Sequence, residues 1–253
     1  MNIKAKKELG QHFLVDENIL RVIERLAALA PDDVVLEIGP GLGVLTRFLA
    51  DRVALVHAVE VDRSLEPHLP DKDNVRVHWG DALRLDLAAL APAPNKLVAN
   101  LPYNVATPIV VESLDGLPSL ELWCVMVQRE VADRFFAQPR TKAYGAVSVL
   151  VQLTVERVGV HSVSREVFRP RPNVDSALVA FRRLTLPENY AHLKDIVEAA
   201  FAHRRKTLPN SLALAGIERK RGEDALRAIG REPSTRAEAL VPQEFVTLAE
   251  ALG

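Results

Sequence analysis

A glycine-rich turn after the first apolar segment is the first feature that indicates a bound ligand. Residues 34–38, VVLEI, are predicted to form a buried strand, and they lead into Gly39, Gly41 and Gly43. Glycines let the backbone turn tightly and come close to a ligand. The pattern matches neither the dehydrogenase fingerprint G-x-G-x-x-G nor the P-loop. Taken alone, the turn leaves an ordinary strand-to-helix connection as an open alternative.

Two acidic residues near the ends of the next two predicted strands make this interpretation more specific. Glu60 follows Gly43 by 17 residues, and Asp81 stands in the sequence Gly80-Asp81-Ala82. An acid at about the position of Glu60 after the glycine turn can accept hydrogen bonds from both ribose hydroxyls of an adenosine ligand. Asp81 can accept one from the amino group of its adenine. Each acid alone is equally typical of a cap or a surface charge. Because the carboxyl ends of parallel strands share one edge of a sheet, the three features together predict an adenosine-type ligand site.

A fourth element, Asn100-Leu101-Pro102-Tyr103, lies at the end of another predicted strand. The amino nitrogen of adenine is a poor nucleophile because its lone pair is delocalised into the ring. The side-chain oxygen of Asn100 and the backbone carbonyl of Leu101 can accept its two hydrogens and localise that lone pair. Pro102 fixes the loop, and Tyr103 can stack on a base that has been taken out of a nucleic acid. The alternative is a plain turn with a buried tyrosine.

Alternating strands and helices must position these residues. This alternation predicts an α/β fold with a doubly wound sheet in a domain covering residues 1–184. From residue 187 onward every segment has a helical pattern, which predicts a small all-helical domain over residues 185–253. The predicted strands cover residues 34–38, 53–62, 75–81, 96–103, 120–128, 155–163 and 177–184, and the helices between them cover residues 17–30, 43–52, 105–115, 129–137 and 144–153.

Composition narrows the class of protein. The chain has 253 residues, of which 48% are hydrophobic and 26% charged, enough for a large core and against disorder. Its single cysteine, Cys124, allows neither an internal disulfide nor a cysteine cluster for zinc. We find no apolar stretch near the roughly 18 residues of a membrane helix, and no apolar signal segment at the start. We therefore expect a cytoplasmic protein with no metal and no membrane association.

The charge is unevenly distributed. The net charge is −1, yet residues 200–221 hold six lysines and arginines against one glutamate. Local basic patches can bind phosphates on a neutral protein. The candidates are Lys4, Lys6 and Lys7 with residues 204–206 and 219–221, and the alternative is a solvated face without a partner.

Six motifs in this order produce a specific resemblance: GQHFL, EIGPGLG, VEVD, GDA, NLPYN and FRPRPNVDSA. They resemble the KsgA family of rRNA adenine N(6),N(6)-dimethyltransferases, over almost the whole chain and including RRKTLPNSL at 204–212. The resemblance implies a Rossmann-like, seven-stranded class I methyltransferase domain with its last strand antiparallel, plus a helical C-terminal domain that contacts RNA. It also implies S-adenosylmethionine as methyl donor. The implied substrate is a pair of adjacent adenines in a 3′-terminal hairpin of 16S rRNA, in the 30S subunit or its precursor, and the protein is expected to act as a monomer in ribosome biogenesis.

The same resemblance implies the site residues. Tyr103 and Phe168 would sandwich the target base, and Asn100, Leu101 and Pro102 would complete the catalytic set. His12 stands where the family commonly has asparagine. A backbone contact there would change little, whereas a side-chain contact would make cofactor affinity respond to pH. The implied cofactor pocket consists of Gln11, His12, Leu14, Gly39, Gly41, Glu60, Val61, Asp81, Ala82 and Asn100.

Several alternatives stay open. Erythromycin-resistance methyltransferases look like relatives with the same core, so the substrate can be an adenine at another rRNA site, or in DNA. A non-catalytic RNA-binding factor for ribosome assembly would also keep this fold. A nucleotide-dependent dehydrogenase fails on the glycine pattern and on NLPY.

Overall fold

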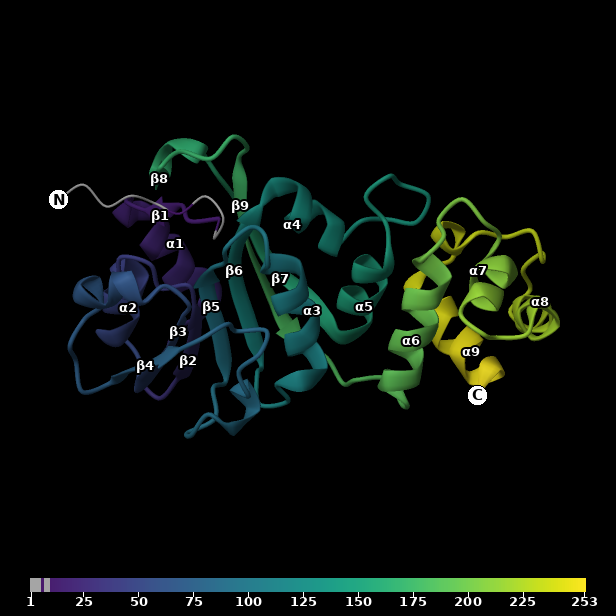
Figure 1. Ribbon diagram of the computed structural model, residues 1–253, viewed down its shortest axis with the longest axis horizontal. Coiled ribbons are helices and arrows are strands. Elements are labelled where there is room, and N and C mark those ends of the chain that lie inside the picture. Colours follow the sequence, from purple (N-terminus) through teal and green to yellow (C-terminus); the bar gives the residue numbers. More distant parts are fainter. Residues whose placement is uncertain (1–5, 7–9) are drawn as a thin grey trace. The chain divides into compact units, whose positions relative to one another are not determined.

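The computed structural model describes residue 6 and residues 10–253. These residues divide into two compact units (Figure 1). The first unit holds the described residues up to Ala132 together with Glu156–Arg183. The second holds Asp133–Val155 and Leu184–Gly253.

A seven-stranded sheet forms the centre of the first unit, in the order β4-β3-β2-β5-β6-β9-β7. The pairs β4–β3, β3–β2, β2–β5 and β5–β6 are parallel, whereas β6 pairs with β9 in antiparallel fashion. This confirms the predicted sheet and its antiparallel last strand. The strands are β2 (Val34–Ile38), β3 (Leu55–Glu60), β4 (Val75–Trp79), β5 (Lys96–Asn100), β6 (Leu122–Gln128), β7 (Val155–Val163) and β9 (Ser176–Arg183).

The strand order places the predicted site at one edge of the sheet. From β2 the chain proceeds to β3 and β4 on one side, and then returns to β5 on the other side of β2. The register pairs Ile38 with Val59, so the glycine turn and Glu60 leave their strands at the same level. Ligands of open parallel sheets bind at the carboxyl ends of the strands where the order reverses. Here that point lies beyond β2 and β5.

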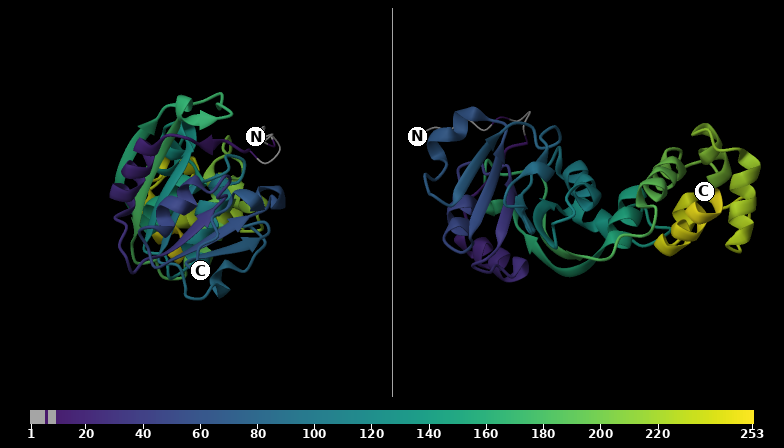
Figure 2. Two further views of the ribbon diagram at one scale, coloured as in Figure 1. Left: turned by 90° about the vertical axis from the view of Figure 1, so that its left-hand side faces the viewer. Right: turned by 90° about the horizontal axis from the view of Figure 1, so that it is seen from below.

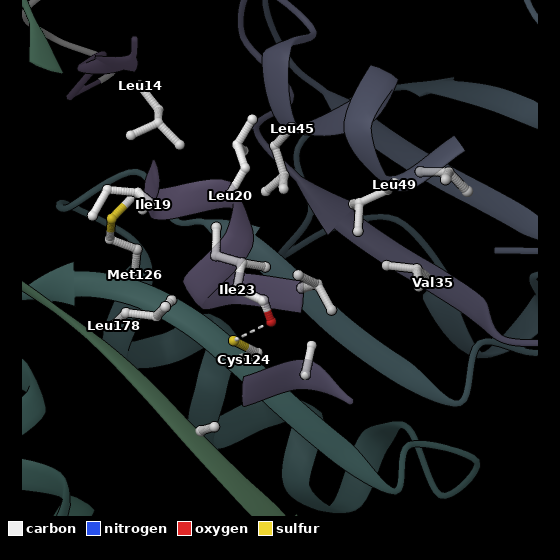
Figure 3. Packing of buried hydrophobic residues seen from close by; sticks show 14 of the residues in the cluster. Leu14, Ile19, Leu20, Ile23, Val35, Leu45, Leu49, Cys124, Met126 and Leu178 are labelled. Carbon is white, nitrogen blue, oxygen red and sulfur yellow. Dashed lines mark hydrogen bonds between the residues drawn. The ribbon is translucent and has the colours of Figure 1, made fainter. Parts of the chain in front are cut away.

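Helix α1 (Glu17–Ala27) closes one face of the sheet. Asp16 caps the helix by accepting a hydrogen bond from the backbone N–H of Asn18 at 2.7 Å. Ile19, Leu20, Ile23 and Ala27 are buried, and the helix packs on β5, β6 and β9. Figure 3 shows Ile19, Leu20 and Ile23 above Cys124, Met126 and Leu178 of the sheet, with Leu45 and Leu49 of α2 (Val44–Ala50) beside them.

Cys124 is a buried core residue, as the sequence predicts. Its side chain is fully buried beneath Ile23. Burial raises the pKa of the thiol well above its ordinary value, because a thiolate would lose its hydration. The residue therefore acts as a small hydrophobe.

The secondary structure of the second unit is almost entirely helical, as Figure 2 shows for the C-terminal part. Helix α5 packs against α6 and α9, and Tyr144, just before α5, donates its hydroxyl hydrogen to the carbonyl of Leu240 at 2.8 Å. The predicted division at residue 184 places residues 133–155 in the first domain. In the structure these residues group with the C-terminal helices, because the apolar side of α5 packs against α6 and α9. The helices are α4 (Arg129–Phe135), which crosses the division, α5 (Ala146–Thr154), α6 (Tyr190–Phe201), α7 (Leu208–Leu214), α8 (Arg219–Ala228) and α9 (Pro242–Leu252).

A second, two-stranded sheet was not expected from the sequence. Strand β1 (Phe13–Leu14) pairs in antiparallel fashion with β8 (Phe168–Arg169), with Leu14 opposite Phe168. It joins the N-terminal segment to the proline-rich loop that follows β7.

Helix α3 (Ala106–Gly116) follows the NLPY loop.

Within residue 6 and residues 10–253, no helix combines the length and apolar character needed to cross a membrane. The same part of the chain holds no group of three His, Cys, Asp or Glu side chains that could bind a metal ion.

Candidate active site

The glycine turn after β2 packs too tightly for side chains. Gly39 and Gly41 have φ angles of 75° and 58°, a region that side-chain-bearing residues rarely adopt. A Cβ atom on Gly41 would lie 2.9 Å from the Phe13 ring, and one on Gly39 would lie 3.1 Å from Pro102. The turn is thus enclosed by the N-terminal segment on one side and the NLPY loop on the other, with a bare backbone between them.

Glu60 is held at the end of β3 by backbone amides. Its carboxylate accepts hydrogen bonds from Val61 and Asp62, both at 2.9 Å, and from Gly41 at 3.2 Å. The residue is buried, and desolvation raises the pKa of its carboxyl group although the three amides oppose this. A carboxylate can accept about four hydrogen bonds, so Glu60 retains capacity for a ligand.

Two adjoining cavities open at this edge of the sheet. Gly39, Glu60, Val61 and Pro102 line both. The first cavity adds the predicted residues Gln11, His12, Leu14, Gly41, Asn100, Leu101 and Tyr103. The second adds Asp81 and Ala82. The structure therefore brings together all the residues predicted for the cofactor.

The second cavity combines a carboxylate with apolar side chains. Asp81 lies at its rim with a half-exposed side chain, and its Oδ1 accepts a hydrogen bond from the N–H of Leu83 at 3.0 Å. Val61 is an apolar side chain that is 54% exposed. Apolar side chains lining a concave site beside a few polar groups are typical of small-molecule pockets.

Asn100 lines the first cavity and carries an acceptor atom without a hydrogen-bond partner in the described part of the chain. Its side-chain NH₂ donates to the backbone carbonyl of His12 at 2.9 Å. The acceptor atom is its buried Oδ1. Leaving a buried acceptor unpaired costs about 1–3 kcal/mol, so this oxygen fits a site that is completed by a ligand's donor.

Tyr103 lies in the same cavity, with its hydroxyl bound to Ser176 and its ring beside His12. Its hydroxyl forms a 2.5 Å hydrogen bond with the Ser176 hydroxyl, and burial raises the pKa of the phenol. Its ring centroid lies 5.2 Å from that of His12. Phe168 is fully buried in the core, because the β1–β8 pairing turns it inward beside Leu14. The sandwich of a target base between Tyr103 and Phe168 stays a prediction, and it would require the Phe168 ring to leave this buried position.

The sequence analysis missed Glu37 as a site residue. This side chain is 1% exposed, lines the first cavity, and has an Oε2 atom without a partner among the described residues. Desolvation raises the pKa of Glu37 to about 8, and the nearby charge of Glu60 contributes. The available signal was a single acid inside the apolar strand VVLEI.

The N-terminal segment is fastened to the end of β3 through Asp62. Lys6 Nζ lies 2.7 Å from one carboxylate oxygen of Asp62, and Gln11 Nε2 donates to the other at 3.1 Å. Burial opposes ionisation of Asp62, but these donors and Ser64 hold the pKa of the carboxyl well below its ordinary value. Lys6, a predicted phosphate contact, is thus engaged within the protein. Lys4 and Lys7 lie outside the described residues.

The sheet order, the antiparallel pairing of β9 with β6 and the paired cavities at the switch point define a Rossmann-like class I methyltransferase. Residues 2–252 match the family described as "Ribosomal RNA adenine dimethylase". The chain belongs to this family, as the motifs predict. Enzymes of this family use S-adenosylmethionine as methyl donor.

Individual relatives agree with this. A protein of Rubrobacter xylanophilus named "Ribosomal RNA small subunit methyltransferase A" is 51% identical over 97% of this chain and 94% of its own length. The solved structure of 23S rRNA methyltransferase ErmE has a TM-score of 0.67 and 32% identity, covering 95% of this chain and 99% of that one. A dimethyladenosine transferase from Plasmodium falciparum has a TM-score of 0.76 at 24% identity, covering 94% and 96%, which shows the shared fold.

Proposed function

We propose that this protein transfers methyl groups from S-adenosylmethionine to the exocyclic amines of two adjacent adenines in a 3′-terminal hairpin of 16S rRNA. The products are dimethyladenines, and the reaction belongs to small-subunit biogenesis in the cytoplasm, with the protein acting as a monomer. The observation that carries the proposal is the unpaired, buried Oδ1 of Asn100 beside the glycine turn. The 51% identical relative is named for the small subunit.

The residues present fit the cofactor. The turn at Gly39 and Gly41 leaves a side-chain-free cradle, and the buried oxygens of Glu37 and Asn100 lack partners within the described residues. Glu60 would hold the ribose hydroxyls and Asp81 the adenine amino group, while the first cavity would take the methionine part. When bound, the cofactor supplies an electrophilic methyl group on sulfur.

Asn100 and Leu101 would act on the target amine. Asn100 Oδ1 accepts one amino hydrogen and the Leu101 carbonyl the other, which turns the nitrogen lone pair towards the methyl donor. Holding the two reacting groups in the correct orientation lowers the activation barrier by roughly 7–11 kcal/mol in favourable cases. After the first transfer one hydrogen remains, so only one acceptor is used in the second. The surplus proton is acidic once the amine carries positive charge, so it passes to solvent without a strong base.

The structure narrows the set of basic residues available for RNA. Arg204 donates hydrogen bonds to the carbonyls of Lys142 and Tyr144. Arg219 donates to the Glu223 carboxylate. Arg221 donates to the Leu252 carbonyl. In residue 6 and residues 10–253, no ion pair or side-chain hydrogen bond engages the exposed charges of the remaining three. These are Arg205, Lys206 and Lys220. We propose that they contact phosphates.

Methylation of an adenine at another rRNA site is the second candidate function. The structural relative ErmE, named for 23S rRNA, supports it. Its 32% identity is lower than the 51% of the relative named for the small subunit, which favours 16S rRNA. A purely non-catalytic role in assembly is disfavoured because the acceptor geometry of Asn100 is intact.

The test is methyl transfer from labelled cofactor to undermethylated small subunits, large subunits and DNA, followed by mapping of the modified bases. We expect two adjacent dimethyladenines near the 3′ end of 16S rRNA. Naked rRNA and a precursor particle, assayed in parallel, would identify the assembly state that is methylated. Label confined to large-subunit RNA or DNA would overturn the substrate, and no label in any arm would overturn the activity.

A further inference from the structure

The aromatic ring beside Tyr103 belongs to His12. The two centroids are 5.2 Å apart and the ring planes are inclined by 32°. This spacing is that of a single aromatic pair in direct contact. A base inserted between the rings would need two such spacings, so an extruded adenine can use only the opposite face of Tyr103. His12 therefore lies behind the base-binding ring.

The His12 ring is also fixed to the proline-rich loop. Its Nδ1 lies 2.7 Å from the carbonyl oxygen of Pro170. A carbonyl only accepts, so Nδ1 carries the hydrogen in this contact. The same loop ends at Ser176, whose hydroxyl binds the Tyr103 hydroxyl. The loop thus holds Tyr103 at two points: directly through Ser176, and through the His12 ring.

The backbone of His12 has a separate task. Its carbonyl accepts the hydrogen bond from the Asn100 side chain at 2.9 Å. Replacing the side chain leaves this carbonyl in place. The orientation of Asn100 should therefore survive substitutions of His12 that alter the support of Tyr103.

We infer that the His12 side chain is a positioning residue of the target-base site, which supports Tyr103 and the Pro170 loop for the incoming adenine. The inference rests on the proposed function. The sequence motif implies a cofactor contact at this position. We assign the His12 imidazole to the binding of RNA.

The test compares His12→Ala, His12→Phe and His12→Asn by three measurements: the dissociation constant of the demethylated cofactor product, the KM for undermethylated small subunits, and kcat. The alanine variant should raise the RNA KM about three- to tenfold, as expected for loss of one ring pair and one hydrogen bond. Its cofactor affinity should stay within about twofold of the wild type by the same reasoning. Phenylalanine restores the ring and should recover most of the KM, whereas asparagine restores only a donor and should recover less.

A double-mutant cycle adds an independent readout. Ser176→Ala removes the other attachment of Tyr103, so its effect on the RNA KM should not add to that of His12→Ala. Additive effects would overturn the inference, as would a weakened cofactor affinity with an unchanged RNA KM. The wild-type protein separates the two proposals: if it fails to methylate small subunits, the proposed function is wrong. If it methylates them and the variants change only cofactor binding, the role of His12 is wrong.

Discussion

The side-chain amide of Asn100 donates to the backbone carbonyl of His12 at 2.9 Å, and this contact determines which way the amide faces. With the NH₂ group engaged, the oxygen is left buried and unpaired at the cavity. A strand end and an N-terminal segment 88 residues apart thereby build one hydrogen-bond acceptor. The chemistry of the proposed reaction depends on this acceptor.

Asn100→Ala should lower kcat for methyl transfer by about 10²–10³-fold, the typical effect of removing one preorganised polar group that stabilises a transition state. Cofactor affinity should be partly retained because Glu60 and the glycine turn are untouched. Asn100→Asp should also be impaired, since a carboxylate has no hydrogen to offer the His12 carbonyl. Single-turnover kinetics with saturating cofactor would measure both, and a fully active alanine variant would remove Asn100 from the mechanism.

Tyr103→Ala should reduce kcat/KM for RNA by the equivalent of about 1–3 kcal/mol, the usual contribution of one base stacked on an aromatic ring. Tyr103→Phe keeps the ring and loses only the bond to Ser176, so it should lie much nearer the wild type. The matched comparison is steady-state methylation of small subunits by the two variants. Equal kcat/KM for alanine and phenylalanine would argue against stacking.

Glu37 should make stability depend on pH. Its pKa is about 8 in the folded protein against an ordinary value of 4.5, so the folded state holds this proton more tightly than the unfolded chain. Between these two values the free energy of unfolding should fall as pH rises, by roughly 1.4 kcal/mol per pH unit from this group, and the effect should level off above about pH 8.

The neutral variant Glu37→Gln should lack that dependence. Urea unfolding at several pH values between 5 and 8.5 would give the difference between wild type and variant, with the exposed Glu66→Gln as control. The wild type should lose stability relative to Glu37→Gln as pH rises. Parallel curves for the two proteins would show that Glu37 ionises normally.

Arg205→Ala, Lys206→Ala and Lys220→Ala should each weaken RNA binding and reduce the slope of log affinity against log salt by about one. The control is Arg227→Ala, which removes the same charge from a side chain already paired with Glu223 and Asp224. Affinity measurements between low and physiological salt would compare them. An unchanged slope in the three variants, or an equal change in the control, would count against this patch.

Much of the site could be predicted because it depends on sheet topology. Gly39, Glu60, Asp81 and Asn100 lie at or just beyond the ends of four strands that the sequence pattern predicts, and the parallel order of those strands brings the four residues to one edge. No long-range detail is needed for that conclusion beyond the alternation of strands and helices.

The remaining details depend on contacts that a local pattern does not encode. Strands β1 and β8 have two residues each, too short for a periodic signal, yet their pairing buries Phe168. The His12 ring meets Tyr103 only because that pairing brings the N-terminal segment to the proline-rich loop. Likewise, α5 was predicted as a helix, but the unit that it joins is decided by which neighbours cover its apolar side.

The most direct test of the central claim, that one pocket holds the methyl donor beside Asn100, is a crystal structure with the demethylated cofactor product bound. We expect electron density running from the second cavity, at Asp81, past Glu60 and the Gly39 turn to Asn100. Density at any other place on the protein, with these two cavities empty at saturating ligand, would contradict it.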